Sequence, residues 1–438
     1  MISVLKKISP VRAMQAFQLM RFSAAFLTGI ILAHSGLSLT TIGTYESLVF
    51  LSAATGFFWV NGISGAFAGS FSIDKERSTR KKINDTYNLL IICSLLVTTV
   101  LYVLKPFVLE WTGPELNTAF PIFLAFVFLN NIGFVNESIM LVQKRALGLI
   151  LYGVFLLSSH LIGALVVLGK GGGIQYLLNL LLAIAIARNI LALTLIGRVG
   201  FERPTRSGIT AMAAASAPLV LSMLLSGSAE TIDGLLVGHF LGPDAFAVFR
   251  YGARELPFAT LLAAALSSAM VAGLAQSGMS VESMRELKRE TAGLMHIVFP
   301  VSIALILSSH FIYPLFFSTA FAQSASVFNI YLLLAIARVC FPQTLVMALG
   351  RNDLIFKTAL IELPVNIVCS LGLLFVAGIE GVAWGTVIAF STEKVILYVR
   401  LRRETPFRLI DFHPVKLWLV YSCILLGAYV VSEIIANQ

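Results

Sequence analysis

Arginines interrupt several long apolar runs of this 438-residue chain. The stretch "FRYGARELPF" places Arg250 and Arg254 four residues apart, and Arg21 and Arg338 lie within two other apolar runs. A charge at the centre of a bilayer costs about 2.5–3.5 kcal/mol on insertion scales, so such residues face a cavity or pair with one another. A guanidinium group stays charged and grips phosphate oxygens with a planar fork. Together, the four arginines predict a wet chamber that receives an anionic group.

Carboxylates share these runs and leave two alternatives open. Arg254 could pair with Glu230 or Asp233, and Arg338 with Glu362, as buried structural ion pairs. Four such pairs are a weaker explanation than a chamber, because the four cations repel one another unless water or an anion lies between them. The carboxylates could instead serve as proton or sodium sites, or as charge partners. These candidates are Glu46, Glu137, Glu230, Asp233 and Glu362.

The composition indicates an all-α polytopic membrane protein. Apolar residues make up 58% of the chain and charged residues 12%, and the mean hydropathy is +0.90. Soluble proteins carry roughly 25% charged residues. A helix needs about 20 mainly apolar residues to cross the hydrocarbon layer. With that measure we expect about thirteen spans, near 12–34, 40–71, 86–109, 117–142, 147–169, 174–197, 210–240, 244–276, 291–316, 322–349, 354–377, 381–399 and 415–436.

Lys and Arg gather in alternate loops. They precede the first span and follow every even-numbered span, as in "IDKERSTRKKIND" and "RLRRETPFR". Cytoplasmic loops attract Lys and Arg, so we expect the N-terminus in the cytoplasm. The net charge of +9 is therefore a topology signal, with contact to anionic lipid head groups, and does not indicate a nucleic-acid partner.

No enzyme is expected from this sequence. The outer loops are too short to hold a donor and an acceptor, and no phosphate-binding glycine loop or catalytic constellation occurs. All four cysteines lie in apolar runs, with spacing that fits neither a metal site nor a disulfide framework. We therefore expect no catalytic residue, no metal and no cofactor beyond H⁺ or Na⁺ as a coupling ion.

An internal repeat divides the chain. Aligning His34 with His239 brings the short outer turn, an aromatic residue and a charge into matching order. The expected organisation is a six-helix half over 1–204, a second over 205–400, and a basic loop with one extra helix over 401–438. Parallel repeats of this kind are typical of transporters whose site lies between the halves.

The chain resembles the multidrug/oligosaccharidyl-lipid/polysaccharide exporter superfamily in three features. These are the two six-span halves, the stretch "IGTYESLVFL" after a short outer turn, and the cations in spans one, eight and ten. The polysaccharide (O-antigen-type) flippase branch fits best. The resemblance implies a V-shaped bundle around a central cavity, and movement of a polyprenyl-pyrophosphate-linked oligosaccharide to the periplasmic leaflet. It also implies that Arg21, Arg254 and Arg338 hold the pyrophosphate, with Arg250 at the cavity's outer edge. Thirteen spans depart from the twelve or fourteen of that superfamily.

The resemblance further implies the bacterial inner membrane, lipopolysaccharide or polysaccharide biosynthesis, and a glycan polymerase and glycosyltransferases as candidate partners. Two other functions stay open. An H⁺- or Na⁺-coupled multidrug antiporter of the same superfamily would want an acidic chamber, which the arginines disfavour. A non-transporting scaffold for glycan assembly would not need charges at membrane depth.

Overall fold

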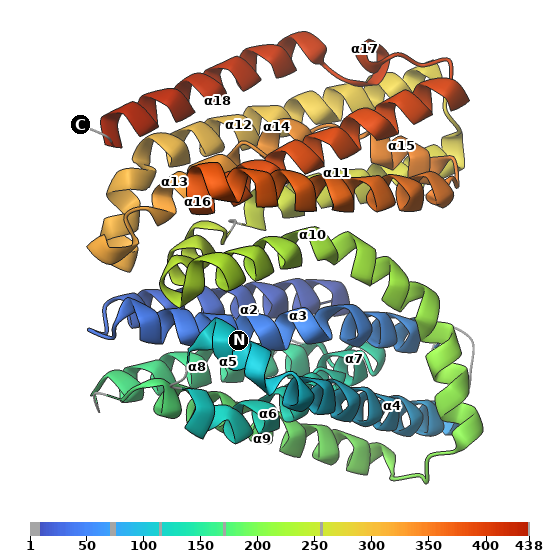
Figure 1. Ribbon diagram of the computed structural model, residues 1–438. Coiled ribbons are helices and arrows are strands. Elements are labelled where there is room, and N and C mark those ends of the chain that lie inside the picture. The colour runs from blue at the N-terminus through green and yellow to red at the C-terminus, as the bar shows by residue number, and fades with distance from the viewer. Residues whose placement is uncertain (1–8, 71–75, 114–115, 170–171, 255–256, 437–438) are drawn as a thin grey trace. The chain divides into compact units, whose positions relative to one another are not determined.

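The computed structural model describes residues 9–70, 76–113, 116–169, 172–254 and 257–436. All regular structure in these ranges is helical. The chain forms two compact units (Figure 1). Unit 1 is Met1–Gly227 with Gly242–Ala247, and unit 2 is Ser228–Leu241 with Val248–Gln438. An α-helix satisfies its own backbone, which is why apolar sequence at bilayer depth takes this form.

In its described residues, unit 1 contains the helices α2 to α9 and, from α10, residues 206–227 and 242–247. Within it α2 packs along α8 and α6 along α9. The rings of Phe17 and Tyr152 stack at a centroid distance of 5.4 Å in its apolar core. The bounds are α2 Pro10–Ala33, α3 Leu39–Gly69, α4 Glu76–Val103, α5 Lys105–Thr112, α6 Leu116–Gly133, α7 Val135–Val142, α8 Ala146–Gly169, α9 Ile174–Val199 and α10 Arg206–Gly252.

Unit 2 contains residues 228–241 and 248–252 of α10 and the helices described after it. Here α12 runs beside α18, and α16 packs against α13 and α15 (Figure 1). The bounds are α11 Pro257–Ser277, α12 Val281–Phe317, the 3₁₀ turn η1 Thr319–Phe321, α13 Ser324–Leu332, α14 Ala335–Arg338, α15 Pro342–Ala348, α16 Asn352–Glu404, α17 Leu409–Phe412 and α18 Val415–Ala436.

Helix α16 folds back on itself. Its 53 residues contain two with non-helical backbone angles, Ala377 and Gly378, and the positive φ of Gly378 (59°) is one that glycine adopts without steric cost. Side chains before this point reach residues after it, with Asn366 bonded to Thr386 and Ser370 to the carbonyl of residue 382. The later of these two residues on the first arm, Ser370, is bonded to the earlier position on the second arm. The two arms, 352–376 and 379–404, are therefore antiparallel.

The segment that carries Arg338 is a broken span. Ser324–Arg338 and Pro342–Ala348 are bent by 46° relative to each other. Pro342 lacks an N–H group, so the regular ladder of backbone hydrogen bonds cannot continue through it. Close to this break, the carbonyl of Ile336 accepts a hydrogen bond of 2.8 Å from the indole N–H of Trp418 on α18 and one of 3.6 Å from the thiol of Cys340. The helix predicted over 415–436 is α18, which therefore contacts the broken span directly through this hydrogen bond.

The predicted count of thirteen spans is not confirmed. The described residues contain eleven helices long and apolar enough to cross a membrane, or up to twelve if the bent pair is one span. The predicted run 244–276 is not one helix, because α10 ends at Gly252 and α11 begins at Pro257. Pro257 has no N–H group and is well suited to the first position of a helix, which agrees with a new helix beginning at this residue. Large apolar side chains are widely exposed, as the surface of a multi-pass membrane protein requires.

Candidate functional site

In unit 1, Arg21 of α2 has a carboxylate partner on α7. Its Nη1 lies 3.2 Å and 3.3 Å from the two carboxylate oxygens of Glu137, and its Nη2 donates to the amide oxygen of Gln18 at 2.6 Å. The Glu137 side chain is 9% exposed, whereas that of Arg21 is 42% exposed. The charge of Glu137 is thus compensated, while a large part of the Arg21 side chain stays exposed.

A second arginine, Arg188 of α9, lies buried in the same unit. Its Nε donates to the hydroxyl of Tyr152 at 2.8 Å and its Nη1 to the amide oxygen of Asn130 at 2.5 Å. The ring of Phe134, at the break between α6 and α7, lies 4.6 Å from this guanidinium and 5.7 Å from that of Arg21. The sequence pattern gave Arg188 no role. The features in the sequence that could have indicated its role are the position of Arg188 within the apolar run 174–197 and that of Asn130 within the run 117–142.

In unit 2, the buried carboxylate is Asp233 of α10, which is 1% exposed. Its Oδ1 accepts from the amide of Asn366 at 3.4 Å and the hydroxyl of Ser370 at 3.2 Å. Its Oδ2 accepts from the hydroxyl of Tyr331 at 3.1 Å and from that of Thr386. These four donors are all neutral, so Asp233 is held by four oriented dipoles drawn from α13 and from both arms of α16.

The stretch "FRYGARELPF" breaks between its two arginines. Arg250 is in the last turn of α10, whereas Arg254 follows the end of that helix, so the helical i, i+4 geometry predicted for the pair does not hold. Both side chains are half-buried. The Arg254 guanidinium lies over the ring of Tyr251, 4.4 Å from its centroid. The side chain of Glu230, one expected partner, lies outside the described residues.

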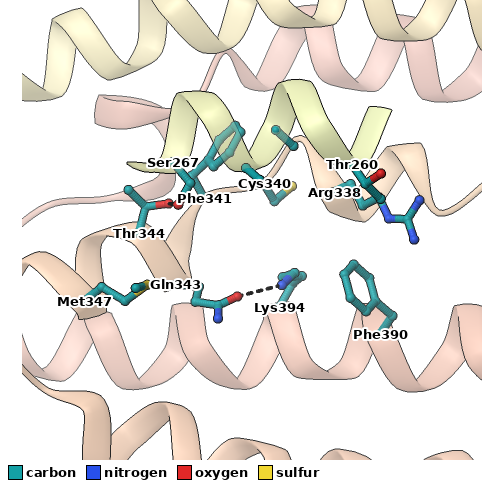
Figure 2. Close-up of a pocket in the computed structure, with 12 residues that line it drawn as sticks. Thr260, Ser267, Arg338, Cys340, Phe341, Gln343, Thr344, Met347, Phe390 and Lys394 are labelled. Carbon is teal, nitrogen blue, oxygen red and sulfur yellow. Dashed lines mark hydrogen bonds between the residues drawn. The ribbon is translucent and has the colours of Figure 1, made fainter. Parts of the chain in front are cut away.

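Arg338 lines a pocket of about 300 Å³ within unit 2 (Figure 2). Lys394, on the second arm of α16, lines it as well, and donates to the side-chain oxygen of Gln343 at 3.4 Å. The two cations flank Phe390, at 5.9 Å and 4.4 Å from its ring centroid. The described lining includes two cations and no carboxylate, namely Thr260, Ala263, Ala264, Ser267, Arg338, Cys340, Phe341, Gln343, Thr344, Met347, Phe390 and Lys394.

The other candidate carboxylates are placed separately. Glu46 is buried in α3 of unit 1. Glu362 is half-buried on the first arm of α16, where it interacts electrostatically with Glu393 and Lys394. Lys394 also forms an ion pair with Glu393 at 2.7 Å. Arg21 belongs to unit 1 and the other three proposed arginines to unit 2, so the four-arginine chamber stays a prediction.

The described residues hold no group of three His, Cys, Asp or Glu side chains arranged to bind a metal ion. The pocket can instead receive an anion. Two cations on one apolar ring, with amide and hydroxyl groups beside them, offer charge and directed donors to phosphate-like oxygens. Its volume lies at the lower end of the range for small-molecule sites.

Solved structures share this fold over nearly the whole chain. The structure titled lipid II flippase MurJ, inward closed conformation, matches with a TM-score of 0.69 and 15% identity, covering 97% of this chain and 98% of that one. A mutant of the Vibrio cholerae MATE transporter VcmN matches with a TM-score of 0.55 and 17% identity, over 94% and 99%. The eukaryotic MATE transporter AtDTX14 gives 0.52 and 15%, over 95% and 100%. At these identities the likeness concerns the fold.

A search of curated protein sequences finds none that matches this chain. A family model described as "Polysaccharide biosynthesis protein" matches residues 37–326, which is more than half of the sequence. The resemblance to the multidrug/oligosaccharidyl-lipid/polysaccharide exporter superfamily is thereby confirmed, and the chain belongs to this family of polysaccharide biosynthesis proteins.

Proposed function

We propose that this protein is a flippase for a lipid-linked oligosaccharide. It would move a polyprenyl-pyrophosphate-linked glycan across the cytoplasmic membrane by alternating access, for polysaccharide or lipopolysaccharide biosynthesis. The observation that carries this proposal is the pocket with Arg338 and Lys394 and no carboxylate in its described lining. A pyrophosphate is the part of such a substrate whose charge is hardest to move through hydrocarbon, so a transporter must compensate it.

The volume of the pocket suits only one part of such a substrate. About 300 Å³ accommodates a phosphate-bearing head group and not a whole oligosaccharide with its lipid. We assign the pyrophosphate to Arg338 and Lys394, with Arg21, Arg250 and Arg254 as further contacts during translocation. Arg21 suits that role because its side chain keeps 42% exposure beside its partner Glu137. The polyprenyl tail would stay in the lipid.

Asp233 is a candidate site for a coupling ion. It is a carboxylate at membrane depth with four neutral donors, and uptake of a proton or sodium ion there would change its charge. We propose Asp233 as the coupling carboxylate of the flippase. The same feature is what an H⁺- or Na⁺-coupled antiporter would use, so antiport of organic cations is the second candidate function.

The cellular setting follows from the same proposal. The long apolar helices and the alternation of basic loops favour the bacterial inner membrane with a cytoplasmic N-terminus. The enzymes that make and polymerise the glycan, glycosyltransferases and a polymerase, would be its partners. The protein itself would carry out transport and no bond-making chemistry.

The test is leaflet exposure of a polyprenyl-pyrophosphate oligosaccharide in proteoliposomes. Wild type should expose the lipid to an added glycan-modifying probe, whereas Arg338→Met and Lys394→Met should lose at least tenfold in rate. Arg338→Lys should keep part of the activity, because an ammonium keeps the charge but not the fork. Arg285→Met, which changes an exposed arginine on α12, is the matched control and should flip normally.

Two results would replace the proposal. Transport of organic cations down an imposed H⁺ or Na⁺ gradient, with no glycolipid movement, would favour the antiporter. No transport of either class by folded, correctly inserted protein would favour a scaffold for glycan assembly. Loss of flipping in the Arg285 control as well would mean that the assay reports surface charge and not the pocket.

A further inference from the structure

Two chain segments, 324–338 and the second arm of α16, donate to one oxygen of Asp233, and the same two segments carry the pocket cations. Tyr331 begins a stretch that ends at Arg338, and Thr386 lies on the second arm of α16, eight residues before Lys394. Both hydroxyls donate to Oδ2 of Asp233. A single carboxylate oxygen therefore ties together two segments whose far ends form the cationic wall of the pocket.

Both connections from the carboxylate to the pocket are continuous. Backbone hydrogen bonds run through the join of α13 and α14, including those from residues 334, 336, 337 and 338 to carbonyls three or four residues earlier. On α16, Thr386, Phe390 and Lys394 are spaced by four residues and so share one helix face. Eight residues of α-helix span about 12 Å along the axis, so the backbone positions of Thr386 and Lys394 are separated by that rise.

The other oxygen of Asp233 has different neighbours. Its donors Asn366 and Ser370 lie on the first arm of α16, and that arm contributes no residue to the described pocket lining. The network thus contains its own internal comparison. Two donors sit on cation-bearing segments and two on the first arm, where each also contacts the second arm, Asn366 at the hydroxyl of Thr386 and Ser370 at the carbonyl of residue 382.

We propose that Asp233 is a positioning residue for the anion pocket: by holding Tyr331 and Thr386 together, it sets the separation of Arg338 and Lys394. Loss of its negative charge, by substitution or by ion binding, loosens the clamp and lowers the affinity for an anion. This inference rests on the proposed function, because it assigns a regulator to the same pocket. Any such coupling is reciprocal, so an anion in the pocket also favours the charged, clamped form of Asp233.

The experiment measures binding of radiolabelled sulfate to the purified full-length protein in detergent. Sulfate is a tetrahedral dianion whose charge does not change near neutral pH. Wild type should bind it, and Lys394→Met should not. Asp233→Asn, Tyr331→Phe and Thr386→Val should each lower the affinity, by tenfold or more for Asp233→Asn. Ser370→Ala removes a donor on the other side of the same carboxylate, on an arm that carries no pocket cation, and should lower the affinity less than Thr386→Val does.

A double-mutant cycle separates positioning from general loss of stability. With Lys394→Gln as the second change, measured at high sulfate, the effect of Asp233→Asn should shrink, because one of the two positioned cations is gone. Wild-type affinity in Asp233→Asn, or equal losses in Ser370→Ala and Thr386→Val, would overturn the clamp while leaving the flippase proposal standing. Absence of sulfate binding in wild type would instead remove the anion pocket, and with it the basis of both proposals.

Discussion

Replacing Arg188 by methionine should destabilise unit 1 strongly without touching the pocket of unit 2. Methionine has a comparable apolar stem, so the main losses are the charge and its directed donors. The hydrogen bonds to Tyr152 and Asn130 disappear, as does the contact with the Phe134 ring. Hydrogen bonds to charged groups contribute about 1.5–3 kcal/mol each, and a cation over a ring about 0.5–2 kcal/mol.

The net loss is smaller than the sum, because burying the guanidinium in the first place was costly. We expect Arg188→Met to lower the free energy of unfolding by about 3–5 kcal/mol, in the range seen when one partner of a buried charged group is removed. Arg188→Lys keeps the charge but reaches only one of the two acceptors, and should lose about 1–3 kcal/mol. Arg198→Gln, an exposed change on the same helix, should stay within about 0.5 kcal/mol.

The assay is equilibrium unfolding in mixed detergent micelles, followed by tryptophan fluorescence, with flipping measured on the same preparations. A stable Arg188→Met protein would refute the view that this arginine is a structural centre. If that stable protein were also inactive in flipping, Arg188 would have to contact the substrate. A destabilised variant that regains flipping at low temperature would agree with the structural role.

Three further changes test other contacts. Trp418→Phe removes the donor to the Ile336 carbonyl and should cost about 1–3 kcal/mol of stability in the same unfolding assay, whereas a neutral result would mean that water replaces the indole. Burial, with the charge of Lys288 second, lowers the pKa of His413 from its ordinary 6.5 to about 4. Between these values the unfolded chain binds a proton that the folded chain does not, so stability should fall by about 2 kcal/mol from pH 7 to 5, and His413→Gln should lack this slope. For Arg21 and Glu137, a double-mutant cycle should give a coupling of about 1–3 kcal/mol, and additive losses would show that the pair contributes nothing.

Much of the architecture could be predicted because bilayer thickness sets helix length. Apolar runs such as 147–169 and 174–197 correspond closely to α8 and α9. The fold-back of α16 also agrees with two separate apolar runs around Gly378, where the sequence reads "AGIEG". Hydropathy did not predict the boundary at Pro257, where α11 begins inside the predicted run 244–276. A proline inside a long apolar run does not lower the mean hydropathy enough to mark the start of a new helix.

The candidate site was harder to predict for a different reason. A lone Arg or Asp in an apolar run is conspicuous, so Arg338 and Asp233 could be selected. Their partners could not, because Thr386 lies 153 residues from Asp233 and Tyr331 lies 98 residues from it. A hydroxyl in a membrane helix usually bonds its own backbone, and only the fold shows which ones reach across. Lys394 lies near the end of the apolar run 381–399, where snorkelling to the interface would also explain a lysine, so its position in the sequence does not mark it as a pocket residue.

The bond between Trp418 and the Ile336 carbonyl also has a consequence for how the protein is made. The two residues are 82 positions apart, and synthesis at 5–20 residues per second separates their emergence from the ribosome by about 4–16 s. During that interval the Cys340 thiol, 3.6 Å from the same carbonyl oxygen, is the side-chain donor already in place, and the stronger indole donor is added only when α18 is made. The bent segment therefore reaches its final hydrogen-bonding pattern only after α18 has been made, which ties the last helix of the chain to the geometry around Arg338.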